Sequence, residues 1–259
     1  ALSRWDRKIS CSSIDKSILR KIDEVDADIV LFQEYYINSD VAKQFQKKMM
    51  NKDRGYVLKC NSNKNKQLLH TVAFCRDDKN FKMMPQEKVK NFSDRIFMFE
   101  YKDFVIIDAH MPLNPKDDES YSENKKKRAE NVEKQWEDIK EYLEKKKDEK
   151  VIFIGDLNVY QRETHQYESF VPLESDVDMQ DLWLKQGGKS DSITYKNKKG
   201  EGSRLDYALV TPGALKRYKY TMSMIPESDE EFKEKWNISD HRMLVVDIEE
   251  NDMRENDYK

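Results

Sequence analysis

Two groups able to do chemistry follow an apolar run in residues 151–159, V-I-F-I-G-D-L-N-V. Asp156 and Asn158 lie two residues apart, where Gly155 ends a predicted buried strand. Here a carboxylate can take a proton from a water molecule while an amide orients the water oxygen. The same pattern is typical of an ordinary turn, in which Asp and Asn bond their own backbone. Taken alone, this stretch favours the turn.

Further polar groups stand at the ends of other predicted apolar strands. Burying a charge beside such strands costs free energy unless the charge is paired or binds a metal. Each group by itself is more simply explained as a solvated strand end or a satisfied core residue, but five such ends together favour one convergent site. The set is Glu34, His110, Asp156 with Asn158, Asp206, and Asp240 with His241.

The composition indicates a globular protein with a heavily charged surface. Charged residues make up 37% of the 259 residues, against a usual quarter, yet 47 basic and 50 acidic side chains leave a net charge of -3. Global charge therefore indicates neither nucleic-acid nor membrane binding. No apolar run approaches the roughly 18 residues of a membrane span. Three cysteines without metal-ligand spacing favour free thiols in a reducing compartment, so we expect a cytoplasmic protein. The expected oligomeric state is a monomer.

The first half of the chain alternates helices and strands. Isoleucines at helical spacing predict a helix over 13–25, and Ser39 is placed to cap a second helix that carries Phe45 and Met49 on one face. Residues 28–34 predict a buried strand ending in Gln33 and Glu34. Further strands are expected at 55–61, 69–76, 95–101 and 104–110, the last two forming a hairpin.

The second half is richer in strands. The longest helix is expected at 122–147, where the basic run 125–128 is interpreted as a solvated face rather than a phosphate contact. Segments 163–170 and 177–186 are expected to be irregular or short-helical. A hairpin (192–196 with 203–211), strands at 216–225 and 242–249, and a helix at 228–235 complete the pattern. Two packed sheets with helices outside them, an α/β sandwich in one domain over 1–259, fit this order best.

The order of five motifs resembles the endonuclease/exonuclease/phosphatase superfamily, whose fold is deoxyribonuclease I-like. The motifs are Q-E at 33–34, D-A-H-M-P-L-N at 108–114, G-D-L-N at 155–158, S-R-L-D-Y at 203–207 and I-S-D-H at 238–241. Each motif alone is weak, but the order is highly specific, and it spans positions 28 to 248. The resemblance implies a four-layer α/β sandwich and Mg²⁺-dependent cleavage of phosphate esters, with Mn²⁺ as a possible substitute.

The resemblance also implies roles for single residues. Glu34 would bind the metal, and Asp240 would support the metal or the neighbouring histidine. Asp156 with Asn158 would position the attacking water. Asp206 would orient His241 against the scissile phosphate, and His110 would stabilise the phosphate or assist the leaving group. Substrate contacts are expected from Tyr35, Asn114, Arg162 and Arg204.

The start of the sequence departs from the family pattern. The family opens with a strand ending in a Trp-Asn or similar pair, whose Asn helps to build the metal site. This sequence begins A-L-S-R-W, which resembles the segment just after that strand. We therefore expect the true start of the chain to precede Ala1, and the metal-site Asn is not assigned.

The motifs conflict on substrate class. His110, where the exonuclease III-like branch has Tyr, is closer to the deoxyribonuclease I, tyrosyl-DNA phosphodiesterase and sphingomyelinase branches, whereas G-D-L-N-V and R-L-D-Y resemble abasic-site nucleases. The leading hypothesis is a nuclease acting on DNA or RNA. The alternative is a phosphatase or phosphodiesterase of a small phosphorylated metabolite or a lipid head group, sphingomyelinase-like or phosphoinositide-like. A non-catalytic scaffold is a third possibility, which the retained polar set disfavours.

Overall fold

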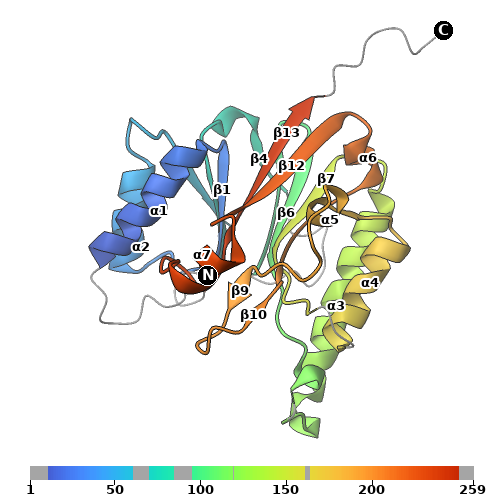
Figure 1. The fold of residues 1–259 in the computed structure, drawn as a ribbon. Coiled ribbons are helices and arrows are strands. Elements are labelled where there is room, and N and C mark those ends of the chain that lie inside the picture. The colour runs from blue at the N-terminus through green and yellow to red at the C-terminus, as the bar shows by residue number, and fades with distance from the viewer. Residues whose placement is uncertain (1–10, 61–69, 85–94, 119, 161–163, 251–259) are drawn as a thin grey trace, which may run out of the picture.

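The computed structural model describes residues 11–60, 70–84, 95–118, 120–160 and 164–250 (Figure 1). A central six-stranded sheet runs through the molecule. Its strands, in spatial order, are β4 (Phe81–Met83), β5 (Ile96–Tyr101), β6 (Phe104–His110), β7 (Val151–Asp156), β11 (Asp206–Val210) and β8 (Gln180–Asp181). Among the described strands of this sheet, β6 and β7 form the parallel pair. The long segment between them contains the helix over residues 123–145, which covers one face of the sheet.

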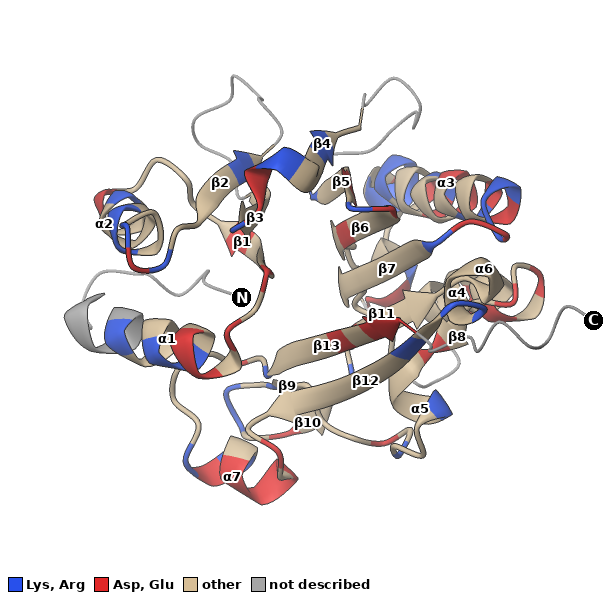
Figure 2. Cartoon of the chain, turned by 90° about the horizontal axis from the view of Figure 1, so that it is seen from above, with Lys and Arg blue, Asp and Glu red and all other residues tan. Residues whose placement is uncertain are grey.

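A second layer of strands packs on the other face of the central sheet, and it is divided in two. One part is a three-stranded sheet in the order β1 (Ile29–Tyr35), β3 (His70–Cys75) and β2 (Val57–Cys60); the other is the antiparallel pair β12 (Tyr218–Ile225) and β13 (Met243–Glu250). Figure 2 shows both parts, with helices beside the three-stranded one. Phe97, Ile152, Ala208 and Met222 belong to the core between the layers. A short hairpin is formed by β9 (Tyr195–Lys196) and β10 (Gly202–Ser203), and Tyr195 forms an isolated β-bridge with His241, just before β13.

Helices cover the two outer faces. The long α3 (Glu123–Lys145) and α4 (His165–Ser175) pack on the central sheet, where the Trp136 ring lies edge-on to both Phe153 and Phe170. The outer face of the three-stranded sheet is covered by α1 (Cys11–Val25) and α2 (Asp40–Met49), with Phe45 and Phe74 in their core. The order helix, sheet, sheet, helix confirms the predicted four-layer α/β sandwich.

The smaller elements sit in the connections. They are η1 (Asp78–Asn80), η3 (Pro115–Asp117), α5 (Leu182–Lys185), α6 (Pro212–Leu215) and α7 (Asp229–Glu234). Ser39 caps α2 as predicted, because its hydroxyl accepts a hydrogen bond from the Ala42 backbone N–H at 3.0 Å. Among the described residues, none of the helices has the length and apolar character needed to cross a membrane.

Candidate active site

Three of the predicted site residues form one row across the central sheet. His110 on β6 lies in register with Asp156 on β7, and Asp156 lies in register with Asp206 on β11. Residues in register on neighbouring strands point to the same face of a sheet. The three side chains therefore leave the sheet together, at the end where β6 and β7 finish and β11 begins, and all three are buried.

Gly155 allows β7 to approach β6 immediately before this row. Its φ is +136°, a conformation that side chains rarely adopt, and an added Cβ would lie 2.0 Å from the backbone oxygen of Ala109. The neighbouring group is backbone within a paired strand, so it has little freedom to move. Glycine is therefore the residue that this pairing requires, and it fixes where Asp156 enters the site.

Asp156 is held by the turn that follows it. The Asn158 backbone N–H donates to Asp156 Oδ1 at 3.1 Å, and Asn158 Nδ2 donates to the Met111 carbonyl at 2.8 Å. Asn158 adopts a φ of 52°, which asparagine tolerates better than most residues. The G-D-L-N segment therefore forms a turn and also places a candidate catalytic carboxylate, because the turn itself orients Asp156. Burial, with the nearby charge of Asp206, raises the pKa of Asp156 well above its ordinary value.

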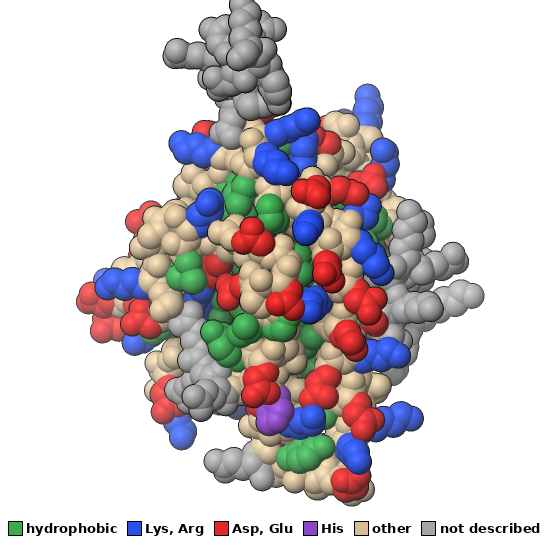
Figure 3. Space-filling model, turned by 90° about the vertical axis from the view of Figure 1, so that its right-hand side faces the viewer, with side chains coloured by type: hydrophobic (Ala, Val, Ile, Leu, Met, Phe, Trp, Pro, Cys, Tyr) green, Lys and Arg blue, Asp and Glu red, His purple; other side chains and the backbone are tan. Residues whose placement is uncertain are grey.

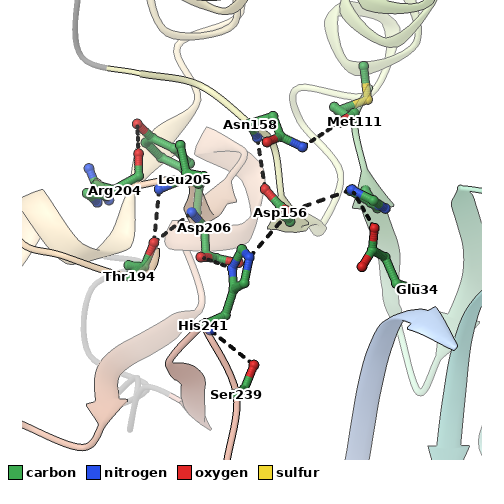
Figure 4. Close-up of polar contacts among 12 residues, drawn as sticks. Glu34, Met111, Asp156, Asn158, Thr194, Arg204, Leu205, Asp206, Ser239 and His241 are labelled. Atoms are coloured by element: carbon green, nitrogen blue, oxygen red, sulfur yellow. Dashed lines mark hydrogen bonds and ion pairs between the residues drawn. The ribbon is translucent and has the colours of Figure 1, made fainter. Parts of the chain in front are cut away.

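His241 is paired with Asp206. Its Nδ1 lies 2.9 Å from Oδ2 and 3.1 Å from Oδ1 of Asp206, while its Nε2 lies 3.9 Å from Asp156 Oδ2 (Figure 4). Burial tends to lower the pKa of His241, but the charge of Asp206 and the hydrogen bond to it more than offset burial and raise this pKa overall. Asp206 thus contacts the Nδ1 side of the His241 ring, and the Nε2 side faces Asp156.

The backbone around this pair is fixed from several sides. The His241 N–H donates to Ser239 Oγ, and the His241 carbonyl accepts from Trp236 Nε1, both at 3.0 Å. Thr194 Oγ1 accepts from the N–H groups of Leu205 and Asp206, at 2.9 and 3.0 Å. These bonds hold both partners of the pair in place before any substrate binds.

Glu34 reaches the row from the second layer. The pairing of β1 with β3 shifts register between Phe32 and Tyr35, and Glu34 has a φ of 54°. Such a β-bulge re-aims a side chain. Glu34 Oε1 lies 3.8 Å from His110 Nε2, which is itself 3.6 Å from Asp156 Oδ2. Burial, with the positive charge of Arg95, lowers the pKa of His110, so its imidazole is neutral at pH 7.

The Glu34 carboxylate suits a hard cation that keeps many of its own water ligands. Among the described residues, no group of three or more His, Cys, Asp or Glu side chains is arranged to hold a metal ion by itself. Mg²⁺, however, is commonly bound by one or two carboxylates together with water and substrate phosphate oxygens. The Glu34 side chain is 20% exposed, so its carboxylate is open to such an ion. The Glu34 carboxylate therefore fits a Mg²⁺ ion whose other ligands are water and phosphate oxygens.

Two residues predicted to contact substrate have buried side chains that make other contacts. Tyr35 is only 2% exposed, packs in the core under α2, and donates its hydroxyl to the Ala42 carbonyl at 3.2 Å. Asn114 is equally buried, and its side chain caps η3 by accepting from the Lys116 N–H at 3.0 Å. Neither side chain is presented to a substrate, because packing and capping already use both. Beyond Tyr35, the next residue Tyr36 is exposed.

Arg204 also differs from its predicted role. Its Nη2 donates to both carboxylate oxygens of Asp181, at 2.8 and 2.6 Å, and the pair is buried. The guanidinium also lies over the Tyr207 ring. Arg204 therefore holds β8 against β11 and does not face the row. Arg162 lies outside the described residues, and Asp240 is half-buried, with its carbonyl accepting from the Lys196 N–H.

One polar pair beside the site, with a single fully buried partner, was not predicted. Asp108 on β6 is fully buried, and its Oδ1 accepts a hydrogen bond from Gln33 Nε2 at 2.5 Å. Complete burial raises the pKa of Asp108 to about 8, despite this hydrogen bond, so its carboxyl group is protonated at pH 7. The signal in the sequence was a charged residue inside the apolar strand 104–110, which needs a partner to be tolerated.

The four layers and their strand order define a deoxyribonuclease I-like fold. Solved structures with this fold include the 3′ phosphatase NExo from Neisseria, bound to a product DNA hairpin (TM-score 0.63, 15% identity, covering 92% of this chain and 95% of that one). A humanized TDP2 from D. rerio (0.59, 16%, 92% of each chain) and an AP endonuclease from Archaeoglobus fulgidus (0.61, 17%, 92% and 95%) are also similar. No family model and no curated protein matches the sequence.

Proposed function

We propose that this chain is a divalent-metal-dependent phosphoric ester hydrolase that acts on nucleic acid. The observation that carries the proposal is the row of His110, Asp156 and Asp206, completed by His241 and faced by Glu34. A phosphodiester needs its negative charge neutralised and a nucleophile aligned with the leaving group, and carboxylates with imidazoles can do both. Further support comes from the similar structures, among them a 3′ phosphatase bound to DNA and an AP endonuclease.

The proposed cofactor is Mg²⁺, with Mn²⁺ as a substitute, held by Glu34 and supported by Asp240. Such an ion, when bound, neutralises phosphate charge and lowers the pKa of a coordinated water. The protein groups have complementary tasks. Asp156, whose pKa is raised by burial, takes the proton of the attacking water. Asn158 fixes the orientation of the Asp156 carboxylate through its backbone N–H.

The two histidines are proposed to act on opposite sides of Asp156. His241 donates through Nδ1 to Asp206, and when it is protonated its Nε2–H is free to donate to a phosphate oxygen. His110 is neutral, so it offers a hydrogen bond to the phosphate or the leaving group without adding charge. Both Nε2 atoms lie within 3.9 Å of Asp156 Oδ2, close enough to contact one phosphate.

The surface charge gives specific support to the alternative, a small phosphorylated metabolite or lipid head group as substrate. Acidic and basic side chains interleave on the face shown in Figure 3. The basic run on α3 is partly neutralised, since Lys125 pairs with Asp118 and Lys126 with Glu123. A long nucleic acid is normally bound through many unpaired cations. A short or single-stranded nucleic acid, or a small phosphate ester, needs fewer unpaired cations on the protein surface.

A hydrolysis panel tests the proposal and separates the substrates. Supercoiled plasmid, abasic duplex, 5′-tyrosyl oligonucleotide, single-stranded RNA, sphingomyelin and phosphoinositides are incubated with Mg²⁺ and with the parent or the Asp156→Ala protein. We expect cleavage of at least one nucleic acid by the parent and none by the variant. Cleavage confined to lipids would move the substrate to the alternative. Plasmid nicking that persists in Asp156→Ala would refute the proposed nuclease.

We further propose a monomer whose residues 1–259 act as one catalytic domain inside the cell. Free thiols at Cys60 and Cys75 support a reducing compartment, since such compartments keep cysteines unpaired. Size-exclusion chromatography with light scattering checks the proposed monomer.

A further inference from the structure

The bulge in β1 brings two consecutive side chains to the same neighbouring strand. Successive residues of a regular strand point to opposite faces, so Gln33 and Glu34 would ordinarily diverge. The register shift and the positive φ of Glu34 change this, and both side chains meet β6. On β6 their partners Asp108 and His110 are two residues apart and therefore share a face. Two cross-layer contacts thus lie side by side, Gln33 with Asp108 and Glu34 with His110.

These two contacts differ in strength. The Gln33–Asp108 pair is a hydrogen bond of 2.5 Å with a fully buried acceptor, whereas the carboxylate of Glu34 and the imidazole of His110 are 3.8 Å apart. Because β1 and β6 belong to different sheets, no ladder of backbone hydrogen bonds between them sets their spacing. Side chains have to set it, and a buried hydrogen bond is costly to break because its groups are then left unpaired.

We propose that Gln33 and Asp108 are positioning residues, whose hydrogen bond sets the distance and angle between Glu34 and His110. The inference rests on the proposed function, in which Glu34 faces the metal and His110 the phosphate. Displacing a catalytic group by about 1 Å can lower turnover by as much as about 100-fold. A link one residue away from Glu34 and two away from His110 is well placed to prevent such a displacement.

The test uses variants that keep or remove the two hydrogen-bonding groups. Asp108→Asn retains a neutral acceptor of the same shape, Asp108→Leu removes the acceptor, and Gln33→Met removes the donor. Thr211→Val is the matched control. It removes a buried hydroxyl that accepts from the Val151 N–H and donates to the Glu149 carbonyl, at the opposite end of β7 from Asp156.

Two readouts distinguish positioning from a general loss of stability. NMR signals of the His110 ring, assigned with a His110→Gln protein, report its surroundings without any substrate. Turnover and KM are measured on the substrate found in the panel, beside the urea midpoint of unfolding. We expect Asp108→Leu and Gln33→Met to shift the His110 signals and lower kcat roughly 10- to 100-fold with little change in KM. Asp108→Asn should stay within about threefold of the parent at pH 6.

The inference is overturned if Asp108→Leu and Gln33→Met resemble Thr211→Val, with a lower urea midpoint but unchanged His110 signals and kcat. If Asp108→Leu does not fold, Gln33→Met decides the matter, because Gln33 is only half-buried. Absence of any Asp156-dependent hydrolysis would refute the proposed function. The His110 signals would still show whether the Gln33–Asp108 bond positions that ring.

Discussion

Replacing Asp206 by asparagine removes the negative charge beside His241 and keeps the shape of the side chain. The asparagine has the same shape, and its amide oxygen can still accept from His241 Nδ1, which lies 2.9 Å from the carboxylate. Thr194 Oγ1 accepts from the backbone N–H groups of residues 205 and 206, which the substitution leaves in place, so both bonds survive. We therefore expect Asp206→Asn to fold normally. Its effects should fall on His241 and on Asp156, whose pKa is lowered when the nearby negative charge is removed.

The expected loss follows from the exchange of a charge-assisted hydrogen bond for a neutral one. A hydrogen bond to a charged group contributes about 1.5–3 kcal/mol and a neutral one about 0.5–1.5 kcal/mol, so about 1–1.5 kcal/mol is lost. About 1.4 kcal/mol corresponds to a tenfold change in rate, so kcat should fall roughly 10-fold. The pH dependence changes as well. Burial lowers the pKa of His241 and Asp206 raises it, so removing the charge lowers this pKa. Activity that requires protonated His241 is then lost at a lower pH than in the parent.

The assay is a pH–rate profile combined with an NMR titration of the His241 ring. Asp229→Asn is the control, because it removes a carboxylate charge that pairs with Arg242, the residue next to His241, at 2.7 Å. The control should keep the parent's kcat and His241 titration. Unchanged kcat and an unchanged His241 pKa in Asp206→Asn would refute the assigned role of Asp206.

Three further substitutions test other parts of the site. Glu34→Ala should raise the Mg²⁺ concentration needed for half-maximal activity more than it changes KM for substrate, and a metal titration identical to the parent's would contradict the role of Glu34. Gly155→Ala puts a Cβ 2.0 Å from the Ala109 oxygen, so we expect a loss of at least about 4 kcal/mol of unfolding free energy or no soluble protein; parent-like urea unfolding would show this reasoning to be wrong. Arg204→Met leaves Asp181 buried without its cation and should cost about 3–5 kcal/mol in urea unfolding while the folded protein keeps its kcat. Loss of kcat at parent-like stability would instead restore Arg204 as a substrate contact.

The sequence predicted the parts of the site that lie at strand ends. Asp156 and His110 follow apolar runs, and strand ends of one sheet meet at its edge, so their convergence was foreseeable. The pairing of His241 with Asp206 came from the order of motifs. Most predicted strands and helices also match the structure within a few residues, because their apolar periodicity is strong.

The predictions that differ from the structure depended on contacts distant in sequence. Tyr35 was placed at the substrate because it follows Glu34, but the bulge turns it into the core. The roles of Asn114 and Arg204 depended on Lys116 and Asp181, partners that no local pattern reveals. Nor did local periodicity indicate that the second layer would be divided into two sheets.

One helix was also underestimated. Residues 163–170 were expected to be irregular or short-helical, whereas α4 runs over His165–Ser175. Pro172 inside the helix removes one backbone hydrogen bond, and Gln166 occupies a buried position where an apolar residue would signal a helix. Gln166 Nε2 donates to the carbonyls of Leu157 and Pro112, at 3.0 and 3.2 Å, so tertiary contacts compensate for the weak local signal.

The row of His110, Asp156 and Asp206 restricts how the length of this chain can vary through evolution. One residue inserted within β6, β7 or β11 ahead of its pairing would turn that strand's polar group toward the helix-covered face. Insertions in the connecting segments leave the row unchanged. Relatives of this protein can therefore gain or lose residues in their loops, and so alter what they bind, while retaining the same chemistry.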